Sequence, residues 1–342
     1  MSEETPTLAD SPEPSSPDST LLTYAKLFRL PNVFTAWADI FMGYLVVSQF
    51  ADIDGKASLN PIALFICLLV SSSLIYIAGM ILNDYFDVEV DRQQRPDRPL
   101  PSGKVSTRLA AWLGFEFLIV GVLLAGLAGY LFPDHAEIAW RGGAIAAMLA
   151  TAVLLYDGVL KKTVLAPLVM GSCRVLNILL GMSLAKQLAP ESDQIFLGYD
   201  LGQLTVACAI GLFIVGVTWF ARKEAEAGHR TSLICGTIVM LLGIGLLAAI
   251  PYTDSIVVSL KMDQYGWWGL LLLLSLVIIR RCVVAINDPQ PKKIQAAVKQ
   301  AILSLIIFDA AIVLAVCGPG WSVVVVALII PMLWLGRWVY ST

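Results

Sequence analysis

The sequence predicts an all-α polytopic membrane protein, and its composition and hydropathy pattern both support this class. Hydrophobic residues make up 58% of the 342 residues and charged residues only 14%, whereas soluble domains keep about 25% charged residues. Apolar runs recur along nearly the whole chain, each close to the ~20 residues that a helix needs to cross a bilayer. The net charge of −3 argues against a nucleic-acid partner.

The first 20 residues differ in composition from the rest of the chain. They are rich in Ser, Pro, Asp and Glu and contain no Lys or Arg. A secretory signal needs a basic start followed at once by an apolar stretch, so this segment does not fit one. We interpret residues 1–20 as a disordered cytoplasmic tail and residues 21–342 as a single transmembrane domain.

Ten apolar segments are candidate membrane spans. In chain order they cover about 33–50, 61–83, 108–131, 142–157, 164–186, 202–221, 231–250, 265–280, 299–317 and 321–338. The fourth is short, and the last two are separated only by Gly318-Pro319-Gly320. That separation could instead interrupt one broken or re-entrant helix, which would leave nine spans.

The loops between these spans differ sharply in basic residues. Eighteen Lys and Arg fall in one set of loops and four in the opposite set. Loops rich in Lys and Arg stay on the cytoplasmic side of a membrane. We therefore expect a multi-pass protein of a bacterial plasma membrane, with both termini and the site near the cytoplasmic face.

The end of the second span carries an acidic motif. It reads Asn83-Asp84-Tyr85-Phe86-Asp87-Val88-Glu89-Val90-Asp91, and spacings of three and four place Asn83, Asp84, Asp87 and Asp91 on one helix face. A helix end that enters water is the simpler interpretation, but it does not require this alignment. Oxygen-rich clusters suit Mg²⁺, which shares its coordination with substrate phosphates. The motif predicts a magnesium diphosphate site.

The following loop combines arginines, including Arg92 and Arg98, with prolines. Prolines end a helix and stiffen a loop, and arginines bind phosphate in a bidentate manner. The acidic motif followed by Arg98-Pro99-Leu100-Pro101-Ser102-Gly103 resembles the first aspartate-rich motif of the UbiA superfamily of intramembrane prenyltransferases. The resemblance extends over about residues 22–340. It implies a UbiA-like bundle of nine or ten transmembrane helices around a central cavity open to lipid.

A second element follows the fourth span. The segment Tyr156-Asp157-Gly158-Val159-Leu160-Lys161-Lys162 is similar to a family loop whose basic residues help to bind diphosphate. The resemblance assigns Tyr156, Lys161 and Lys162 to substrate binding. Ordinary cytoplasmic positive charge is the alternative explanation for the two lysines.

The expected second acidic motif lies at the end of the sixth span, and there the chain departs from the family pattern. Trp219 stands where the pattern has its leading aspartate, while Glu224 and Glu226 supply the remaining acids. Arg222 adds a cation that can bind phosphate. The second metal site is thus rebuilt or weakened, and a solvated helix end remains the alternative interpretation.

Arg174 and Asn177 are three residues apart within the fifth span and share one helix face. A charge at mid-membrane costs at least about 2.5 kcal/mol, so Arg174 must face a cavity or a partner. The candidate counter-charges are Asp39, Glu116 and Asp309. A structural ion pair and a substrate-cavity role both remain open.

The resemblance implies an enzyme that transfers a prenyl group, an alkyl group other than methyl, from a polyprenyl diphosphate to an aromatic or other lipophilic acceptor. Mg²⁺ is the implied cofactor, and no nucleic-acid partner is expected. An alternative is a non-catalytic relative that binds or moves an isoprenoid or secondary-metabolite precursor, because the stretches around Arg174 and Arg222 also resemble the EboC-like branch. The implied metal ligands are Asp84, Asp87, Asp91, Glu224 and Glu226, with Asn83 beside them, and the implied substrate-binding residues further include Arg29, Arg92, Arg98, Arg174, Asn177 and Arg222.

Overall fold

The computed structural model describes residues 20–48, 60–133, 138–184, 191–222, 230–253, 255 and 258–339. These residues form helices and no strand. The predicted tail, residues 1–20, lies outside the described residues except for Thr20. The elements in order are α1 (Thr20–Leu27), α2 (Leu30–Ser48), α3 (Asn60–Phe86), α4 (Val88–Gln94), α5 (Thr107–Leu131), α6 (Arg141–Leu155), η3 (Tyr156–Leu160), α7 (Ala166–Gly181), η4 (Glu191–Asp193), α8 (Leu201–Ala221), α9 (Arg230–Ala248), η5 (Ile250–Tyr252), α10 (Gln264–Asn287), α11 (Pro291–Cys317), α12 (Pro319–Ala327) and α13 (Ile329–Val339).

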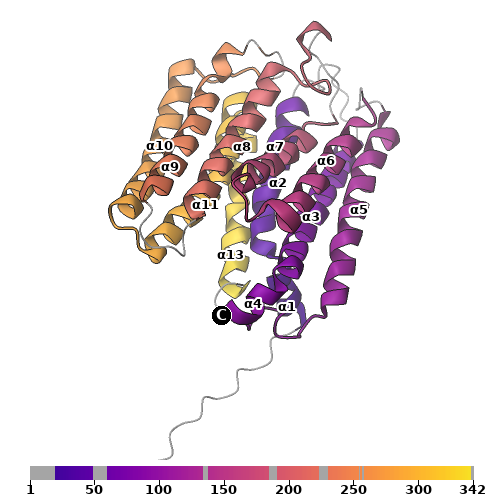
Figure 1. Ribbon diagram of the computed structural model, residues 1–342. Coiled ribbons are helices and arrows are strands. Elements are labelled where there is room, and N and C mark those ends of the chain that lie inside the picture. Colours follow the sequence, from indigo (N-terminus) through magenta and orange to yellow (C-terminus); the bar gives the residue numbers. More distant parts are fainter. Residues whose placement is uncertain are drawn as a thin grey trace, which may run out of the picture.

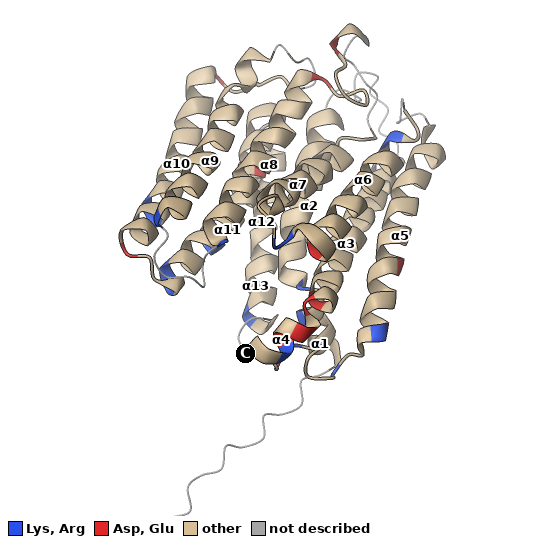
Figure 2. Cartoon of the chain, viewed as in Figure 1, with Lys and Arg blue, Asp and Glu red and all other residues tan. Residues whose placement is uncertain are grey.

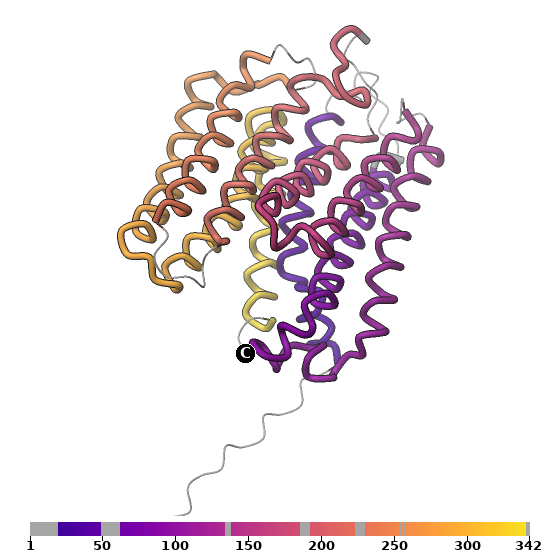
Figure 3. Tube along the Cα trace, in the orientation of Figure 1, coloured from indigo at the N-terminus to yellow at the C-terminus, as the bar shows by residue number. Residues whose placement is uncertain are grey.

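Three helices form the centre of the bundle. The most apolar segments of α2, α8 and α11 are each 67% buried inside the protein, against 22% for α10. Figure 1 shows α9 and α10 at one flank and α5 and α6 at the other. Distant parts of the sequence meet at the centre, since α11 and α13 both pack against α2 (Figure 3). The outer helices expose apolar side chains, as a lipid environment requires.

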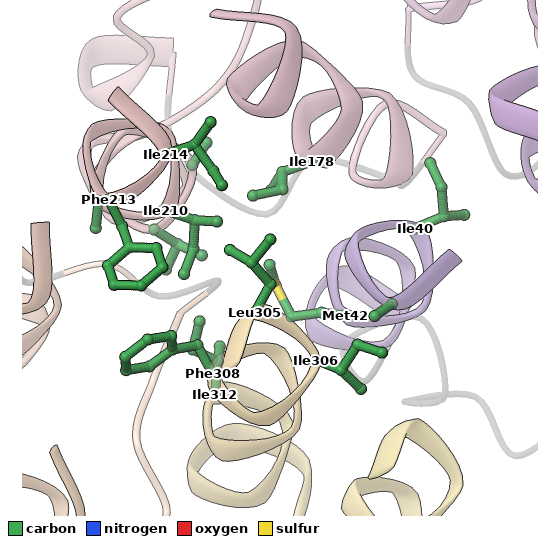
Figure 4. Close-up of a cluster of buried hydrophobic side chains, with 14 of the residues drawn as sticks. Ile40, Met42, Ile178, Ile210, Phe213, Ile214, Leu305, Ile306, Phe308 and Ile312 are labelled. Carbon is green, nitrogen blue, oxygen red and sulfur yellow. The ribbon is translucent and has the colours of Figure 1, made fainter. Parts of the chain in front are cut away.

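The central helices are joined by tightly packed apolar side chains (Figure 4). Phe213 of α8 and Phe308 of α11 meet edge to face, with ring centroids 5.1 Å apart. Both rings are buried, and Leu305 and Ile306 of α11 are buried beside them. Dispersion contacts of this kind hold membrane helices together, because lipid tails are as apolar as the core.

The predicted spans are confirmed, although α10 continues to Asn287 and α11 begins at Pro291, several residues beyond the predicted bounds. Nine helices among the described residues are long and apolar enough to cross a membrane, and the shorter α7 occupies the predicted fifth span. At Gly318, whose φ is +96°, α11 ends and α12 begins. Ser322 then donates a hydrogen bond of 2.8 Å to the Ala310 carbonyl, so the chain folds back on α11. The separation at Gly318 is therefore a reversal between two helices.

Charge is distributed unevenly between the two ends of the bundle. Figure 2 shows Lys and Arg gathered at the end that carries α1, α4 and the end of α13. The acidic residues at the end of α3 and in α4 lie at the same end. This end is the one to which the sequence assigned the cytoplasmic loops.

Close approach of α8 and α9 depends on glycine. A Cβ added at Gly216 would lie 2.5 Å from the Met240 backbone nitrogen and 2.7 Å from the Gly236 carbonyl oxygen. Small residues of this kind let membrane helices approach closely. We expect Gly216→Ala to lower the free energy of unfolding by about 1–3 kcal/mol through overpacking.

Gly245 on α9 provides the matched control, because a Cβ there meets no atom within 4 Å. Gly245→Ala should leave stability unchanged or raise it, since alanine favours helix over glycine by about 1 kcal/mol. Thermal unfolding of both variants in one detergent measures the difference. Equal melting temperatures for the two would contradict the close helix contact.

Candidate active site

A cavity of about 510 Å³ lies between the central helices and is lined by residues of α2, α3, α6, η3, α7, α8 and α11. Its walls are largely apolar, with Ile75, Val153, Ile214, Ile302 and Leu305 among them. Polar side chains line it at two levels. Charged residues lie at the end where α3 meets α4, and a second polar group lies deeper along α2 and α7.

The acidic motif lies at the junction of α3 and α4. Helical hydrogen bonding continues through it, because the Asp87 nitrogen donates to the Asn83 carbonyl and the Asp91 nitrogen donates to the Asp87 carbonyl, at 3.1 and 2.9 Å. The motif nevertheless separates into two groups. Asn83 and Asp87 line the cavity, whereas Asp84 and Asp91 are buried at 3% and 4% exposure.

Two arginines neutralise the buried acids. Arg29 Nη2 lies 2.7 Å from Asp84 Oδ1, and Arg98 Nη1 lies 2.6 Å from Asp91 Oδ2 and 3.3 Å from Asp84 Oδ1. Arg29 connects α1 to α2 with a φ of +46°. Non-glycine residues rarely hold this conformation, and such strain clusters at functional sites. Both arginines also line the cavity.

The wall beside the acidic motif comes from η3, one turn of π-helix after α6. Such turns are rare and often occur at functional sites. Lys161, which follows η3, pairs with the Asp87 carboxylate. Asn83 Nδ2 donates a hydrogen bond of 2.9 Å to Asp157 Oδ1, and Tyr156 and Asp157 both line the cavity. The structure thus brings Asn83, Asp87, Tyr156 and Lys161 together.

Sequence reasoning missed two residues of this site, Asp157 and Arg95. Both line the cavity, and Asp157 is 9% exposed. Asp157 stood in the quoted Tyr156–Lys162 segment, but a single acid beside two lysines carries no signal of its own. Arg95 lies in the arginine-bearing loop, and only that loop's composition could have indicated it.

Other predicted site residues do not line the cavity. Arg92 is exposed and pairs with exposed Glu89 at 2.6 Å, and Lys162 is exposed. Arg222 ends α8 next to the cavity-lining Ala221 but does not line the cavity itself. Glu224 and Glu226, the predicted acids of the second motif, lie outside the described residues.

The deeper polar group is centred on Arg174 of α7. Arg174 Nη1 lies 2.7 Å from Asp39 Oδ2 of α2, so Asp39 is the counter-charge among the three candidates. Asn177 Nδ2 donates to the same carboxylate at 2.8 Å and to the Ala36 carbonyl at 3.0 Å. Ser72 of α3 donates to Asn177 Oδ1 at 2.7 Å.

The charged end of the cavity offers oxygen ligands of the kind that Mg²⁺ prefers. The described residues contain no ready-made group of three His, Cys, Asp or Glu around one point. Asp87, Asp157 and the Asn83 amide nevertheless meet at the cavity wall. One or two carboxylates, with waters and substrate phosphates, are the usual protein contribution to a Mg²⁺ site. These residues therefore fit a magnesium diphosphate.

The sequence profile of the UbiA prenyltransferase family matches residues 40–306. The chain belongs to this family. The chain is also similar to curated proteins named digeranylgeranylglyceryl phosphate synthase. That of Metallosphaera sedula is 33% identical over 159 residues, which cover 46% of this chain and 50% of the relative. That of Methanopyrus kandleri is 28% identical over 280 residues, 77% of this chain and 88% of the relative. The Metallosphaera sedula alignment thus spans about half of that relative's length.

Solved structures show the same UbiA fold. A structure described as giving insights into digeranylgeranylglyceryl phosphate synthase in membranes superposes with a TM-score of 0.60 at 22% identity, covering 87% of this chain and 98% of that chain. A UbiA homologue from Archaeoglobus fulgidus bound to DMAPP and Mg²⁺ superposes with a TM-score of 0.57 at 15% identity, covering 89% and 99%. The predicted all-helical UbiA-like bundle is confirmed by these likenesses.

Proposed function

We propose that this UbiA family member transfers a prenyl group from a polyprenyl diphosphate to an aromatic or other lipophilic acceptor within the membrane, with Mg²⁺ as cofactor. The observation that carries the proposal is the cavity itself. Its charged end combines carboxylates with Arg29, Arg98 and Lys161, and its apolar walls continue into the membrane interior. A diphosphate with a long isoprenoid tail has the same division between charge and hydrocarbon.

The residues at the charged end take distinct roles in this proposal. Asp87, Asp157 and Asn83 would hold Mg²⁺, which supplies charge stabilisation for the diphosphate. Arg98, Arg29 and Lys161 bind the diphosphate oxygens and stabilise their charge as the leaving group departs. The predicted ligands Asp84 and Asp91 hold the two arginines in place, and they can reach a metal only by exchanging those partners.

The reaction breaks the bond between the first prenyl carbon and the diphosphate oxygen, and the electron pair leaves with the diphosphate. The remaining allylic cation is captured by an electron pair of the acceptor, which forms a new carbon–oxygen or carbon–carbon bond and loses one proton. Apolar walls such as Val153, Ile214 and Leu305 exclude the water that would otherwise capture the cation.

The location of the basic residues supports a cytoplasmic active site. Lys and Arg gather at the end of the bundle that holds the acidic motif (Figure 2), and basic loops remain in the cytoplasm. A soluble diphosphate product would then leave into the cytoplasm. On this basis the protein is a multi-pass protein of the plasma membrane with cytoplasmic termini.

A second candidate function, binding or movement of an isoprenoid without transfer, follows from the altered second motif. Trp219 occupies the leading acid position and is 40% exposed. The two buried acids of the first motif are already paired with Arg29 and Arg98. A cavity with these features can still bind a prenyl diphosphate. The two functions differ in one measurable property, the release of diphosphate.

The deciding experiment incubates the purified protein in nanodiscs with prenyl diphosphates of increasing chain length, a panel of lipophilic phenols and glycerol ethers, and Mg²⁺. We expect diphosphate release that depends on both donor and acceptor, that EDTA abolishes, and that added Mg²⁺ restores. Tight donor binding without release for any acceptor would favour the binding function. Release that is unaffected by EDTA would contradict the magnesium assignment.

A further inference from the structure

Arg174 presents unused hydrogen-bond donors to the apolar part of the cavity. Both of its hydrogen bonds, to Asp39 Oδ2 at 2.7 Å and to the Thr35 carbonyl at 3.2 Å, use Nη1. Within the described residues, the N–H groups on Nε and Nη2 meet no acceptor. The side chain is 11% exposed, and its open side borders the cavity. Unpaired donors in a membrane interior are costly, so this side favours a ligand that supplies an oxygen.

The surroundings of Arg174 fix it in place. Asp39 is fully buried and also accepts a hydrogen bond from Asn177. Asn177 in turn uses both of its amide hydrogens and its oxygen within the protein. Four helices, α2, α3, α7 and α11, contribute to this polar group. A guanidinium held so firmly gives a ligand oxygen a preorganised binding position.

The net charge of the polar group around Arg174 indicates which kind of ligand oxygen fits best. Asp309 of α11 is fully buried, and neither of its oxygens receives a hydrogen bond from a donor among the described residues. Arg174 is already paired with one acid, since its Nη1 lies 2.7 Å from Asp39 Oδ2. One guanidinium and one carboxylate sum to zero charge, and Asp309, as a second acid, adds no positive charge that would attract an anion. A neutral hydroxyl or carbonyl oxygen fits this balance, whereas an anion would disturb it.

The depth of Arg174 separates it from the diphosphate end. Thr35, which it contacts, lies five residues along α2 from Leu30, the residue after Arg29, or about 7.5 Å at 1.5 Å per residue. A prenyl diphosphate whose diphosphate group binds at Arg29 and Arg98 has only its hydrocarbon tail at the depth of Arg174. An oxygen at Arg174 must therefore belong to a second molecule.

We propose that Arg174 binds a neutral hydroxyl oxygen of the prenyl acceptor and thereby positions the acceptor between the diphosphate end and the apolar walls. The identification of the bound molecule as the prenyl acceptor rests on the proposed transfer function. The binding site itself is inferred from the geometry alone. The acceptor hydroxyl has two chemical sources, a glycerol ether lipid or a phenol. Both present the same oxygen to the guanidinium.

The test compares pairs of lipids that differ only in this oxygen. Binding of 1-O-octadecylglycerol is compared with its 2-deoxy counterpart, and binding of 4-hexadecylphenol with hexadecylbenzene, to purified protein in nanodiscs. We expect the wild type to prefer the hydroxyl-bearing member of one pair by at least tenfold in Kd, and that pair identifies the source. The double variant Asp39→Asn/Arg174→Met should lose the preference to within about twofold.

The double variant removes Arg174 without leaving Asp39 as an uncompensated buried charge, which the single variant would do. Binding of dimethylallyl diphosphate with Mg²⁺ reports that the double variant is folded, and we expect a Kd within about threefold of the wild type. A hydroxyl preference retained by the double variant, or absent from the wild type in both pairs, would overturn the proposal. Because these are binding measurements, a hydroxyl preference without diphosphate release would refute the transfer function alone.

Discussion

Replacing Asp87 with asparagine is expected to reduce prenyl transfer by at least about 100-fold, the scale of loss when one preorganised group that stabilises transition-state charge is removed. Asp87 is the one acid of the first motif that lines the cavity among the described residues, and Lys161 pairs with it. Asparagine keeps the shape of the side chain but removes its charge. The metal and the lysine would both lose their anionic partner.

The same substitution should hardly affect folding. The Asp87 and Lys161 side chains are 22% and 30% exposed, and partly exposed ion pairs contribute about 1 kcal/mol or less to stability. Diphosphate release and thermal unfolding, measured on the same nanodisc preparation, separate the two effects. Undiminished transfer by a folded Asp87→Asn variant would refute the assignment.

Glu89 supplies a matched control two residues away. It lies in α4, its side chain is 76% exposed, and it pairs with exposed Arg92. We expect Glu89→Gln to retain transfer within about twofold, because surface charges of this kind affect little. An equal loss in both variants would mean that net charge of the segment, and not a position at the cavity, controls activity.

The positions of the helices in the sequence were predictable because each membrane-spanning helix crosses the same apolar bilayer. A bilayer requires about 20 apolar residues per helix and satisfied backbone groups within each one, so spans such as 202–221 and α8 (Leu201–Ala221) agree within a residue. The sequence also limited the partners of Arg174 to three acids. It could not choose Asp39 over Glu116, because that choice depends on how α2 and α5 are arranged around α7.

The site was predictable only in part, since the spacing of polar residues does not show how an irregular turn is formed. The three- and four-residue spacings of the acidic motif persist in the structure, yet Asp84 and Asp91 are neutralised by Arg29 and Arg98 instead of lining the cavity. Asp157 enters the site through the π-helical turn η3. The change from α-helical to π-helical hydrogen bonding over the five residues of η3 follows from tertiary packing and leaves no pattern in the sequence.

Arg98→Met is expected to lower both stability and transfer, because Arg98 is the cation that Asp91 contacts at 2.6 Å. The variant leaves Asp91, at 4% exposure, as a buried charge without its partner. Breaking a buried pair in this way costs about 3–5 kcal/mol, and the 26% exposure of Arg98 reduces the expected loss to about 2–4 kcal/mol. Thermal unfolding measures this loss, and diphosphate release should fall by at least about 100-fold.

The double variant Arg98→Met/Asp91→Asn separates the structural role of Arg98 from its binding role. Neutralising Asp91 removes the unpaired charge, so stability should recover most of the loss. Transfer should not recover, because the cavity still lacks the guanidinium that binds the departing diphosphate. Arg92→Met, on the exposed side of the same segment, should match the wild type in both measurements. If Asp91→Asn alone were fully active and the double variant equally so, Arg98 would serve only to neutralise Asp91, and the diphosphate would bind through Arg29 and Lys161.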